Sequence, residues 1–330
     1  MIRVGVIGYG TMGQLHSANL KKLPGVELAA VADLDAERRR QAEAALGVKT
    51  YEQGEELISD PHIDLVAIAV PTDGHGALLK RAVELDKHVF CEKPLVRTKA
   101  ECRMVEKLAA KSTKKIGVGH VVRFSPEYAA AREKVLAGSI GRPAVARTFR
   151  GGSMFPLGWQ DWYADFDRSG GVILDLAIHD IDYLRWCFGE VTRVYAKSTK
   201  GLTDERMEHA FVILRFENGV IAHVEGNWAN YQGQFYTTLE MAGSKGIVSF
   251  DTRHTAPILY TKAGAQGEQA NVTLPESPAL VSPYEAEIAD MIAAIQEGRD
   301  PKVTLKDALA TTRVALAALE SLETGQAVNL

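Results

Sequence analysis

The stretch Gly8-Tyr9-Gly10-Thr11-Met12-Gly13 decides the fold of the first half of the chain. It follows the apolar run Ile2–Ile7 and precedes a helical pattern over residues 11–22. In such a strand, turn and helix, the first glycine permits the turn, the second lets backbone approach a pyrophosphate, and the third lets the helix pack on the strand. Because N–H groups at the helix N-terminus then face the anion, the stretch predicts a dinucleotide-binding turn.

The next strand pattern supports this interpretation. It covers residues 27–32 and ends at Asp33, which lies 20 residues after Gly13. An acidic side chain at that place accepts hydrogen bonds from the adenosine ribose and repels a 2′-phosphate, so we expect NAD. Arg38 is close enough in sequence to leave NADP as an alternative. The alternative to dinucleotide binding is that the glycines form an ordinary turn of another α/β protein and that the aspartate at position 33 is incidental.

Length and composition indicate a two-domain globular protein. The chain has 330 residues, of which 46% are hydrophobic and 24% charged. A formal net charge of −4 with mixed signs argues against nucleic acid or an anionic membrane as a partner. No secretory signal pattern and no apolar run near the roughly 18 residues of a membrane span are present. The three cysteines lack C-x-x-C spacing, which is typical of reduced thiols, so we expect a cytoplasmic protein.

Short apolar strands alternate with helical patterns up to about His120. We expect strands over residues 2–7, 27–32, 65–70, 88–91 and 115–119, and helices over 11–22, 36–46, 55–59, 74–85 and 99–111. This alternation predicts a parallel sheet covered on both faces, with ligands bound beyond the carboxyl ends of its strands. Those ends read Gly8 to Gly13, Asp33, Pro71-Thr72, Glu92-Lys93-Pro94 and His120 to Arg123.

The pattern becomes rich in β-strands after one further helix over residues 126–137. We expect strands over 144–149, 191–198, 208–216, 220–228, 237–242 and 246–250, and helices over 172–187, 284–296 and 305–322. Asn218-Gly219 is a hairpin signal, so an antiparallel meander is expected. We place a first domain at residues 1–122 and a second at 123–330, whose C-terminal helix, about 304–322, packs back on the first domain.

Lys93 stands just past the end of the fourth expected strand. Its ammonium there can hydrogen-bond a substrate oxygen, stabilise a developing alkoxide and help to relay a proton. A solvated surface lysine is the structural alternative.

Asp175 and His179 are separated by four positions in a helical pattern, so they share one helix face, where the carboxylate can orient the imidazole. A buried structural pair is the alternative to a catalytic one. Asp180 and Asp182 raise a metal site as a third reading. Because those two aspartates point to other faces and no cysteine or second histidine completes a ligand set, we expect no metal.

Aromatic residues shortly before Asp175 form a third signal. Trp159, Trp162 and Tyr163 suit a polyhydroxylated ligand, although core packing is the better explanation for any single one of them.

Together these residues resemble the glucose-fructose oxidoreductase, inositol dehydrogenase and MocA family. The likeness rests on the glycine turn, Asp33, Glu92-Lys93-Pro94, His120 to Phe124, and Gly170-Gly171 leading into Asp175 and His179. It implies an α/β Rossmann domain, an α+β domain with an open, mainly antiparallel sheet, and homodimers or homotetramers joined through that sheet. It also implies a cis peptide bond between Lys93 and Pro94.

The same resemblance implies Lys93, Asp175 and His179 as the catalytic set, with His179 in proton transfer. The expected cofactor-binding residues are Gly8, Gly10, Thr11, Met12, Gly13, Asp33, Arg38, Pro71, Thr72, His75, Glu92 and Lys93. The expected substrate-binding residues are Lys93, Arg123, Gln160, Trp162, Asp175 and His179. Inositol dehydrogenases carry an arginine pair where this chain has Val122-Arg123, which is a departure from their pattern.

We therefore expect an NAD-dependent, or alternatively NADP-dependent, dehydrogenase of a sugar, cyclitol or related polyol. An NAD-using glycoside hydrolase and a ligand sensor without chemistry are the alternatives. The presence of Lys93, Asp175 and His179 together argues against the sensor, which has no need of all three. The sequence names neither the sugar nor the carbon that is oxidised.

Overall fold

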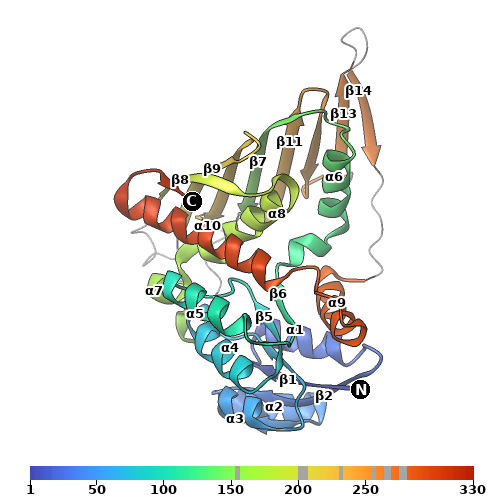
Figure 1. Cartoon of the computed structure of the whole chain (residues 1–330), viewed down its shortest axis with the longest axis vertical. Coiled ribbons are helices and arrows are strands. Elements are labelled where there is room, and N and C mark those ends of the chain that lie inside the picture. The colour runs from blue at the N-terminus through green and yellow to red at the C-terminus, as the bar shows by residue number, and fades with distance from the viewer. Residues whose placement is uncertain (153–156, 200–206, 230–232, 255–257, 264–268, 275–280) are drawn as a thin grey trace. The chain divides into compact units, whose positions relative to one another are not determined.

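The chain divides into two compact units in a computed structural model, which describes residues 1–330 except 153–156, 200–206, 230–232, 255–257, 264–268 and 275–280 (Figure 1). The first unit contains Met1–Val121 and Val281–Thr312, and the second contains Val122–Leu280 and Arg313–Leu330. We had expected residues 281–312 in the second domain, so the observed division corrects that expectation.

The first unit contains a parallel sheet, as predicted, and its strand order is β3-β2-β1-β4-β5-β6. Apolar runs such as Leu65–Ile68, buried throughout, form its central strands because both faces are covered. The short β3 was missed. The strands are β1 (Ile2–Ile7), β2 (Val26–Ala32), β3 (Lys49–Tyr51), β4 (Leu65–Ile68), β5 (His88–Glu92) and β6 (Ile116–Gly119). The helices are α1 (Thr11–Leu20), α2 (Ala36–Leu46), α3 (Gly54–Ser59), α4 (His75–Glu84) and α5 (Lys99–Ala109).

Helix α9 (Pro283–Glu297) completes the core of the first unit. Its apolar residues Ile288, Met291 and Ile292 join one buried cluster with Leu20 of α1 and Phe90 of β5. Burial of these side chains explains why residues 281–312 belong to the first unit. The following helix, α10 (Leu305–Thr324), is shared: residues up to Thr312 belong to the first unit and later ones to the second.

The second unit contains a nine-stranded sheet with the order β14-β13-β12-β11-β7-β10-β9-β8-β15. Neighbouring strands are antiparallel except β7 and β10, which pair in parallel, so the predicted meander is interrupted. A long connection between these two strands permits the parallel pairing. The strands are β7 (Pro143–Gly151), β8 (Val191–Ser198), β9 (Glu208–Phe216), β10 (Ile221–Trp228), β11 (Tyr236–Gly243), β12 (Gly246–Asp251), β13 (Ile258–Ala263), β14 (Gln269–Leu274) and β15 (Val328–Asn329).

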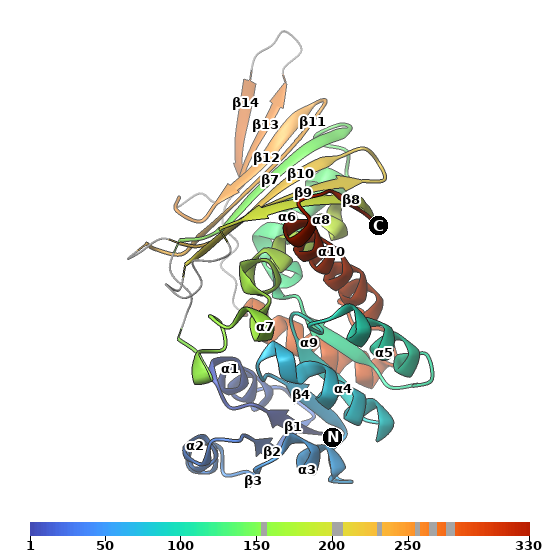
Figure 2. The same ribbon diagram turned by 90° about the vertical axis from the view of Figure 1, so that its left-hand side faces the viewer.

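Helices cover one face of this second sheet, as Figure 2 shows for α6 (Pro126–Leu136), α8 (Ile178–Phe188) and the end of α10. In β9 buried and exposed residues alternate, so the other face is open. A short helix, α7 (Phe166–Ser169), precedes a π-helical turn, Ile173–Ala177, which runs directly into α8. The single helix expected over 172–187 therefore begins with a π turn. Among the described residues, no helix has the length and hydropathy to cross a membrane.

Candidate functional site

The glycine turn between β1 and α1 has the predicted geometry. Gly8 has a φ of +90°, and a Cβ there would lie 2.5 Å from the carbonyl oxygen of Ala69. A Cβ on Gly13 would lie 1.7 Å from the carbonyl oxygen of Gly8, so only glycine lets α1 pack this closely on the turn. The tight turn and close packing predicted for the first and third glycines are confirmed.

The N-terminus of α1 is open to an anion. Gly10 is its N-cap residue, makes no side-chain cap, and is followed by no acidic residue in the first turn. A Cβ on Gly10 would meet only Arg38 Nη1, at 3.6 Å. Thr11 is exposed and Met12 half-buried. A helix start with this open backbone fits a pyrophosphate.

Asp33 follows β2 and holds its carboxylate in one orientation. Oδ2 accepts a hydrogen bond from the Tyr9 N–H at 2.6 Å, and Oδ1 accepts one from the Asp35 N–H at 2.8 Å. Arg38 Nη1 lies 3.8 Å from Oδ2. A carboxylate oriented beside the glycine turn fits a ribose diol. The neighbouring guanidinium could bind a 2′-phosphate, so it leaves NADP as an alternative cofactor.

Lys93 and Pro94 form the turn after β5. The peptide bond between them is cis, as the resemblance implied, and Lys93 is half-buried. His75, at the start of α4, lies against this turn: its Nδ1 is 2.8 Å from the Pro94 carbonyl oxygen and its Nε2 is 2.9 Å from that of Val70. Burial lowers the pKa of His75, while the two carbonyls raise it.

These contacts give His75 a structural role. Both of its ring nitrogens face backbone carbonyls and the residue is buried, so it holds two turns together, while its direct contact with a cofactor stays a prediction. The turns that it joins include Pro71 and the buried Thr72, which follow β4. Their cofactor contacts stay a prediction.

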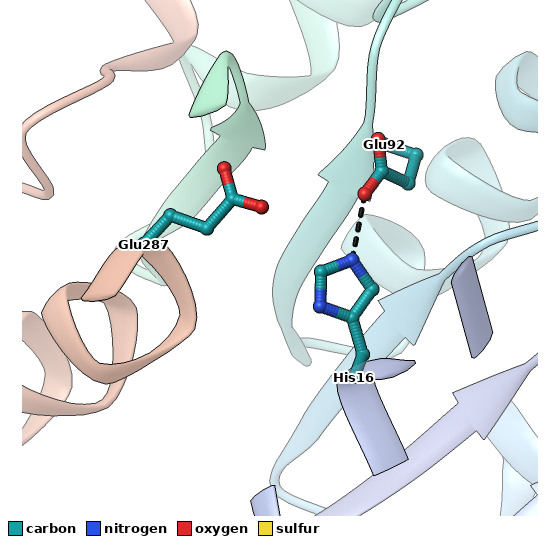
Figure 3. Close-up of side chains that lie close together, drawn as sticks. All are labelled: His16, Glu92 and Glu287. Carbon is teal, nitrogen blue, oxygen red and sulfur yellow. Dashed lines mark hydrogen bonds and ion pairs between the residues drawn. The ribbon is translucent and has the colours of Figure 1, made fainter. Parts of the chain in front are cut away.

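Glu92, the last residue of β5, belongs to a buried triad with His16 of α1 and Glu287 of α9 (Figure 3). His16 Nε2 lies 2.6 Å from Glu92 Oε1, and Glu92 Oε2 accepts a hydrogen bond from the Lys93 N–H at 3.2 Å. Burial opposes ionisation of Glu92, but the His16 hydrogen bond and the charges of His16 and Lys93 hold its pKa below the usual value. The triad thus contacts the Lys93 backbone directly.

The sequence reasoning missed His16 and Glu287. His16 follows the glycine turn on α1, so its position next to the predicted site was an available signal. Glu287 gave none, because it comes from α9, far away in the sequence.

Asp175 and His179 lie on the segment that joins the π turn to α8. Asp175 is 7% exposed, and its Oδ2 accepts a hydrogen bond from Trp228 Nε1 at 3.0 Å. His179 is half-buried in the first turn of α8. Trp228, the last residue of β10, was also missed; it gave no signal beyond its place at a strand end. π turns occur often at functional sites, and here one carries the predicted aspartate.

Glu208 and Gly171 fix where this segment begins. The Val172 N–H donates to Glu208 Oε2 at 2.9 Å, and Glu208 is fully buried. Gly171 has a φ of +67°, and a Cβ there would lie 2.4 Å from the same oxygen. The backbone of Gly171 therefore passes close to the carboxylate that holds the first N–H of the helix.

Two buried ion pairs hold α8 from its sides. Arg123 donates to both Asp182 oxygens, at 2.7 and 2.8 Å, and Arg150 donates to both Asp180 oxygens, at 2.8 and 3.0 Å. Asp180 and Asp182 each accept two hydrogen bonds from a buried arginine, and this explains why two aspartates stand so close together in the sequence. The Arg123 side chain is 3% exposed and engaged with Asp182, and its contact with substrate stays a prediction.

The expected aromatic residues lie just before α7. The ring of Trp162 is 4.0 Å from that of Tyr163, measured between centroids, and both rings are half-buried. Gln160 is exposed and has a φ of 51°. Substrate contacts of Gln160 and Trp162 remain predictions.

Two family models match the chain. A model described as an oxidoreductase family with an NAD-binding Rossmann fold matches residues 2–120, and one for the GFO/IDH/MocA C-terminal domain matches residues 128–249.

Relatives match from end to end. A myo-inositol 2-dehydrogenase of Thermotoga maritima is 34% identical over 345 residues, which cover 100% of this chain and 98% of the relative. A scyllo-inositol 2-dehydrogenase (NAD(+)) of Bacillus subtilis is 30% identical over 100% of this chain and 96% of that protein. The solved structure of scyllo-inositol dehydrogenase from Lactobacillus casei, with bound NAD(H) and scyllo-inositol, has a TM-score of 0.82 and 25% identity, covering 100% of this chain and 99% of that one. The chain therefore belongs to the GFO/IDH/MocA family of oxidoreductases, with an NAD-binding Rossmann domain in its first half.

Proposed function

We propose that the protein is an NAD-dependent dehydrogenase that oxidises a secondary alcohol of an inositol or a related sugar or polyol. The observation that carries this proposal is the end-to-end similarity to a myo-inositol 2-dehydrogenase. The similar scyllo-inositol 2-dehydrogenase that is named for NAD(+) supports the choice of cofactor, together with the oriented carboxylate of Asp33.

Bound NAD supplies the nicotinamide that takes a hydride from the carbinol carbon. His179 removes the hydroxyl proton as the carbonyl forms. Nδ1 is a buried nitrogen of its ring, so we assign proton transfer to Nε2. Lys93 keeps the role that the resemblance implies, which is to hydrogen-bond a substrate oxygen and stabilise its developing negative charge. Asp175 accepts a hydrogen bond from Trp228 Nε1, and we assign to it the orientation of the imidazole that the spacing of four residues predicts. The reverse reaction uses the same groups.

A substrate screen tests the proposal. Purified protein is mixed with a panel of inositols, sugars and polyols and with NAD or NADP, and the absorbance of the reduced nicotinamide is followed. Net NADH from a free polyol is the expected result. Release of an aglycone without net NADH would instead indicate the glycoside hydrolase, and binding without turnover the sensor.

Replacement of His179 by Asn tests the proton-transfer role. We expect kcat to fall about 100-fold to 10,000-fold, because general acid–base catalysis contributes on that order. The Kd for NAD should not change, since the glycine turn belongs to the other unit. His254→Asn, at an exposed histidine of the second unit, is the matched control. Near wild-type turnover by His179→Asn with NAD bound would refute the assignment.

We also propose that copies of the chain associate through the open face of the second sheet. That face carries exposed apolar side chains: Phe211 is 48% exposed, Ile213 40%, Ile221 41% and Ile247 39%. The strand register puts Ile213 opposite His223 and Arg147 opposite Glu240, so charges of both signs lie among them. Such a face, apolar and of mixed charge, is complementary to a second copy of itself.

A cytoplasmic location fits the cysteines. Cys91, Cys102 and Cys187 are buried and form no disulfide among the described residues, and burial raises the pKa of Cys187 to about 12. Buried thiols of this kind are unreactive. Cysteines that stay reduced are typical of a reducing compartment such as the cytoplasm. Fractionation of cells that express the native gene checks this location.

A further inference from the structure

The buried triad of His16, Glu92 and Glu287 contains one carboxyl group that the fold does not pair. Glu287 is 2% exposed, and among the described residues neither of its oxygens has a hydrogen-bond partner. Figure 3 shows its carboxyl group directed toward the hydrogen-bonded His16 and Glu92. One ligand-type atom from each residue lies within 4.8 Å of the other two. A second buried carboxylate beside Glu92 would need a proton or a cation to compensate its negative charge.

A shared proton explains the spacing better than a metal ion. Donor atoms on one tetrahedral zinc, at bond lengths of about 2.1 Å, stand about 3.4 Å apart. His16 Nε2 and Glu92 Oε1 are 2.6 Å apart, the separation of a strong charge-assisted hydrogen bond. Glu92 Oε2 is already engaged by the Lys93 N–H. The triad is therefore arranged around protons.

The charges that face Glu287 do not favour its ionised form. From α1 the facing group is His16, which is hydrogen-bonded to Glu92, and from β5 it is Glu92 itself, with Lys93 beyond. Strand β6 offers no titratable side chain. On α9, Glu285 lies 3.4 Å from Lys22, and Asp290 lies 2.8 Å from Arg299, so both are engaged elsewhere. Burial, and then the charge of Glu92, raises the pKa of Glu287 well above the usual carboxyl value.

We propose that Glu287 is a neutral carboxylic acid in the folded protein, and that the triad is a positioning element for Lys93 that works only while Glu287 keeps its proton. With Glu287 neutral, Glu92 carries the single negative charge of the triad, and its hydrogen bond with His16 and the nearby Lys93 stabilise that charge. Loss of the proton would put a second negative charge beside Glu92 in a space sealed from water, which costs far more than exposure of the same charge.

The link to Lys93 is short. Glu92 Oε2 holds the Lys93 N–H, and a Cβ on Gly119 of β6 would lie 3.1 Å from that oxygen. The carboxylate therefore rests against bare backbone and has little room to turn. A change of charge at Glu287 would therefore shift the carboxylate of Glu92, and through its hydrogen bond it would shift the backbone that carries the Lys93 ammonium. The consequence for turnover rests on the proposed function, whereas the protonation of Glu287 does not.

Stability as a function of pH tests the protonation. A carboxyl group whose pKa is raised by folding stabilises the protein below its unfolded pKa of about 4.3, and this contribution is lost as pH rises toward the folded pKa. The unfolding constant of the wild type should thus rise relative to that of Glu287→Gln by about tenfold per pH unit above about pH 5. Glu285→Gln, on the same helix but at a surface ion pair, is the control.

Urea unfolding is followed by circular dichroism, because all four tryptophans belong to the second unit and report little on the triad. The proposal is overturned if the ratio of the wild-type unfolding constant to that of Glu287→Gln stays constant with pH. Glu287 would then be ionised in both the folded and the unfolded protein.

Infrared spectroscopy gives a second readout. The wild type at neutral pH should show the carbonyl band of a protonated carboxylic acid, and the band should be absent from Glu287→Gln or, if that variant does not fold, from Glu287→Leu. Elemental analysis of the purified protein completes the test. If the wild type contains one equivalent of a divalent metal and Glu287→Gln contains none, the triad binds a metal ion and the proposed proton on Glu287 is wrong.

The positioning role has its own readout. Glu287→Gln should keep kcat constant to a higher pH than the wild type, because its amide cannot ionise, while KM for the polyol changes little. If the pH profiles of kcat coincide although the infrared band is present, the link to Lys93 is wrong and only the protonation stands. If no polyol is turned over, the proposed function fails, and the stability and infrared results still decide the state of Glu287.

Discussion

At the scale of single residues, we expect the orientation of Asp33 to decide which dinucleotide the first unit prefers. Both of its oxygens already accept hydrogen bonds from backbone N–H groups, so the carboxylate cannot swing away from the glycine turn. A fixed carboxylate can accept from ribose hydroxyls without first losing conformational freedom, and it repels a phosphate in the same place. Arg38 Nη1 lies 3.8 Å from Asp33 Oδ2, so the two side chains form an ion pair.

Replacement of Asp33 by Ser should therefore change the cofactor preference. We expect kcat/KM for NAD to fall roughly 10-fold to 100-fold, in line with about 1.5–3 kcal/mol for hydrogen bonds to a charged group. kcat/KM for NADP should rise, because Arg38 loses its partner. Asp35→Ser is the control, since serine can still cap α2. An unchanged ratio of the two kcat/KM values would show that Asp33 does not read the ribose.

Residues of the first unit that belong to one local pattern could be predicted from the sequence. The glycines of the turn and Asp33 act through backbone geometry that neighbours in the sequence impose, so their spacing was enough. Glu287 and Trp228 act through contacts between distant elements, which no local pattern encodes. Arg123 was assigned to the substrate because its position after β6 was visible, whereas its partner Asp182 on α8 was not.

At the scale of elements, the start of the segment that carries Asp175 and His179 depends on one close approach. The Gly171 backbone passes the carboxylate of Glu208, which holds the Val172 N–H. This anchor sets the rotation at which the π turn begins, and with it the direction of the residues that follow. A local distortion here should reach both predicted catalytic side chains.

Gly171→Ala tests this dependence. A Cβ at this positive φ would lie 2.4 Å from Glu208 Oε2, so we expect destabilisation of roughly 1–3 kcal/mol together with a loss of kcat. Gly47→Ala is the matched control, because Gly47 has a φ of +68° with no atom within 4 Å of the added Cβ. Thermal unfolding and kcat are measured for both. Equal effects would mean that strain at the backbone, and not contact with Glu208, is responsible.

Element types were more predictable than their pairing. Helix α2 begins and ends where its pattern does, because Asp35 caps its start and Gly47 its end. The parallel pairing of β7 with β10 and the π turn before α8 were not visible, because both depend on which distant strand or carboxylate lies alongside. Periodicity indicates a helix or strand; it does not identify the neighbour.

At the scale of the whole molecule, the open sheet face should set the oligomeric state. Ile213→Glu places a charge among the exposed apolar side chains of that face, which should weaken association by roughly 3 kcal/mol or more. Light scattering after size-exclusion chromatography should show smaller particles than the wild type. Leu136→Glu, at the exposed end of α6, adds the same charge away from the face and should not change the mass. A wild type that is already monomeric would rule out the proposed association.

The residues after 281 belong to both units: α9 closes the core of the first, and β15 adds a strand beside β8 in the second. During synthesis the glycine turn therefore leaves the ribosome long before the helix that must cover its sheet. Until that helix arrives, Leu20 and Phe90 lack the apolar partners that α9 supplies, and incompletely covered apolar surface of this kind is prone to aggregation. The enzyme's first-made half is thus among the last to be finished.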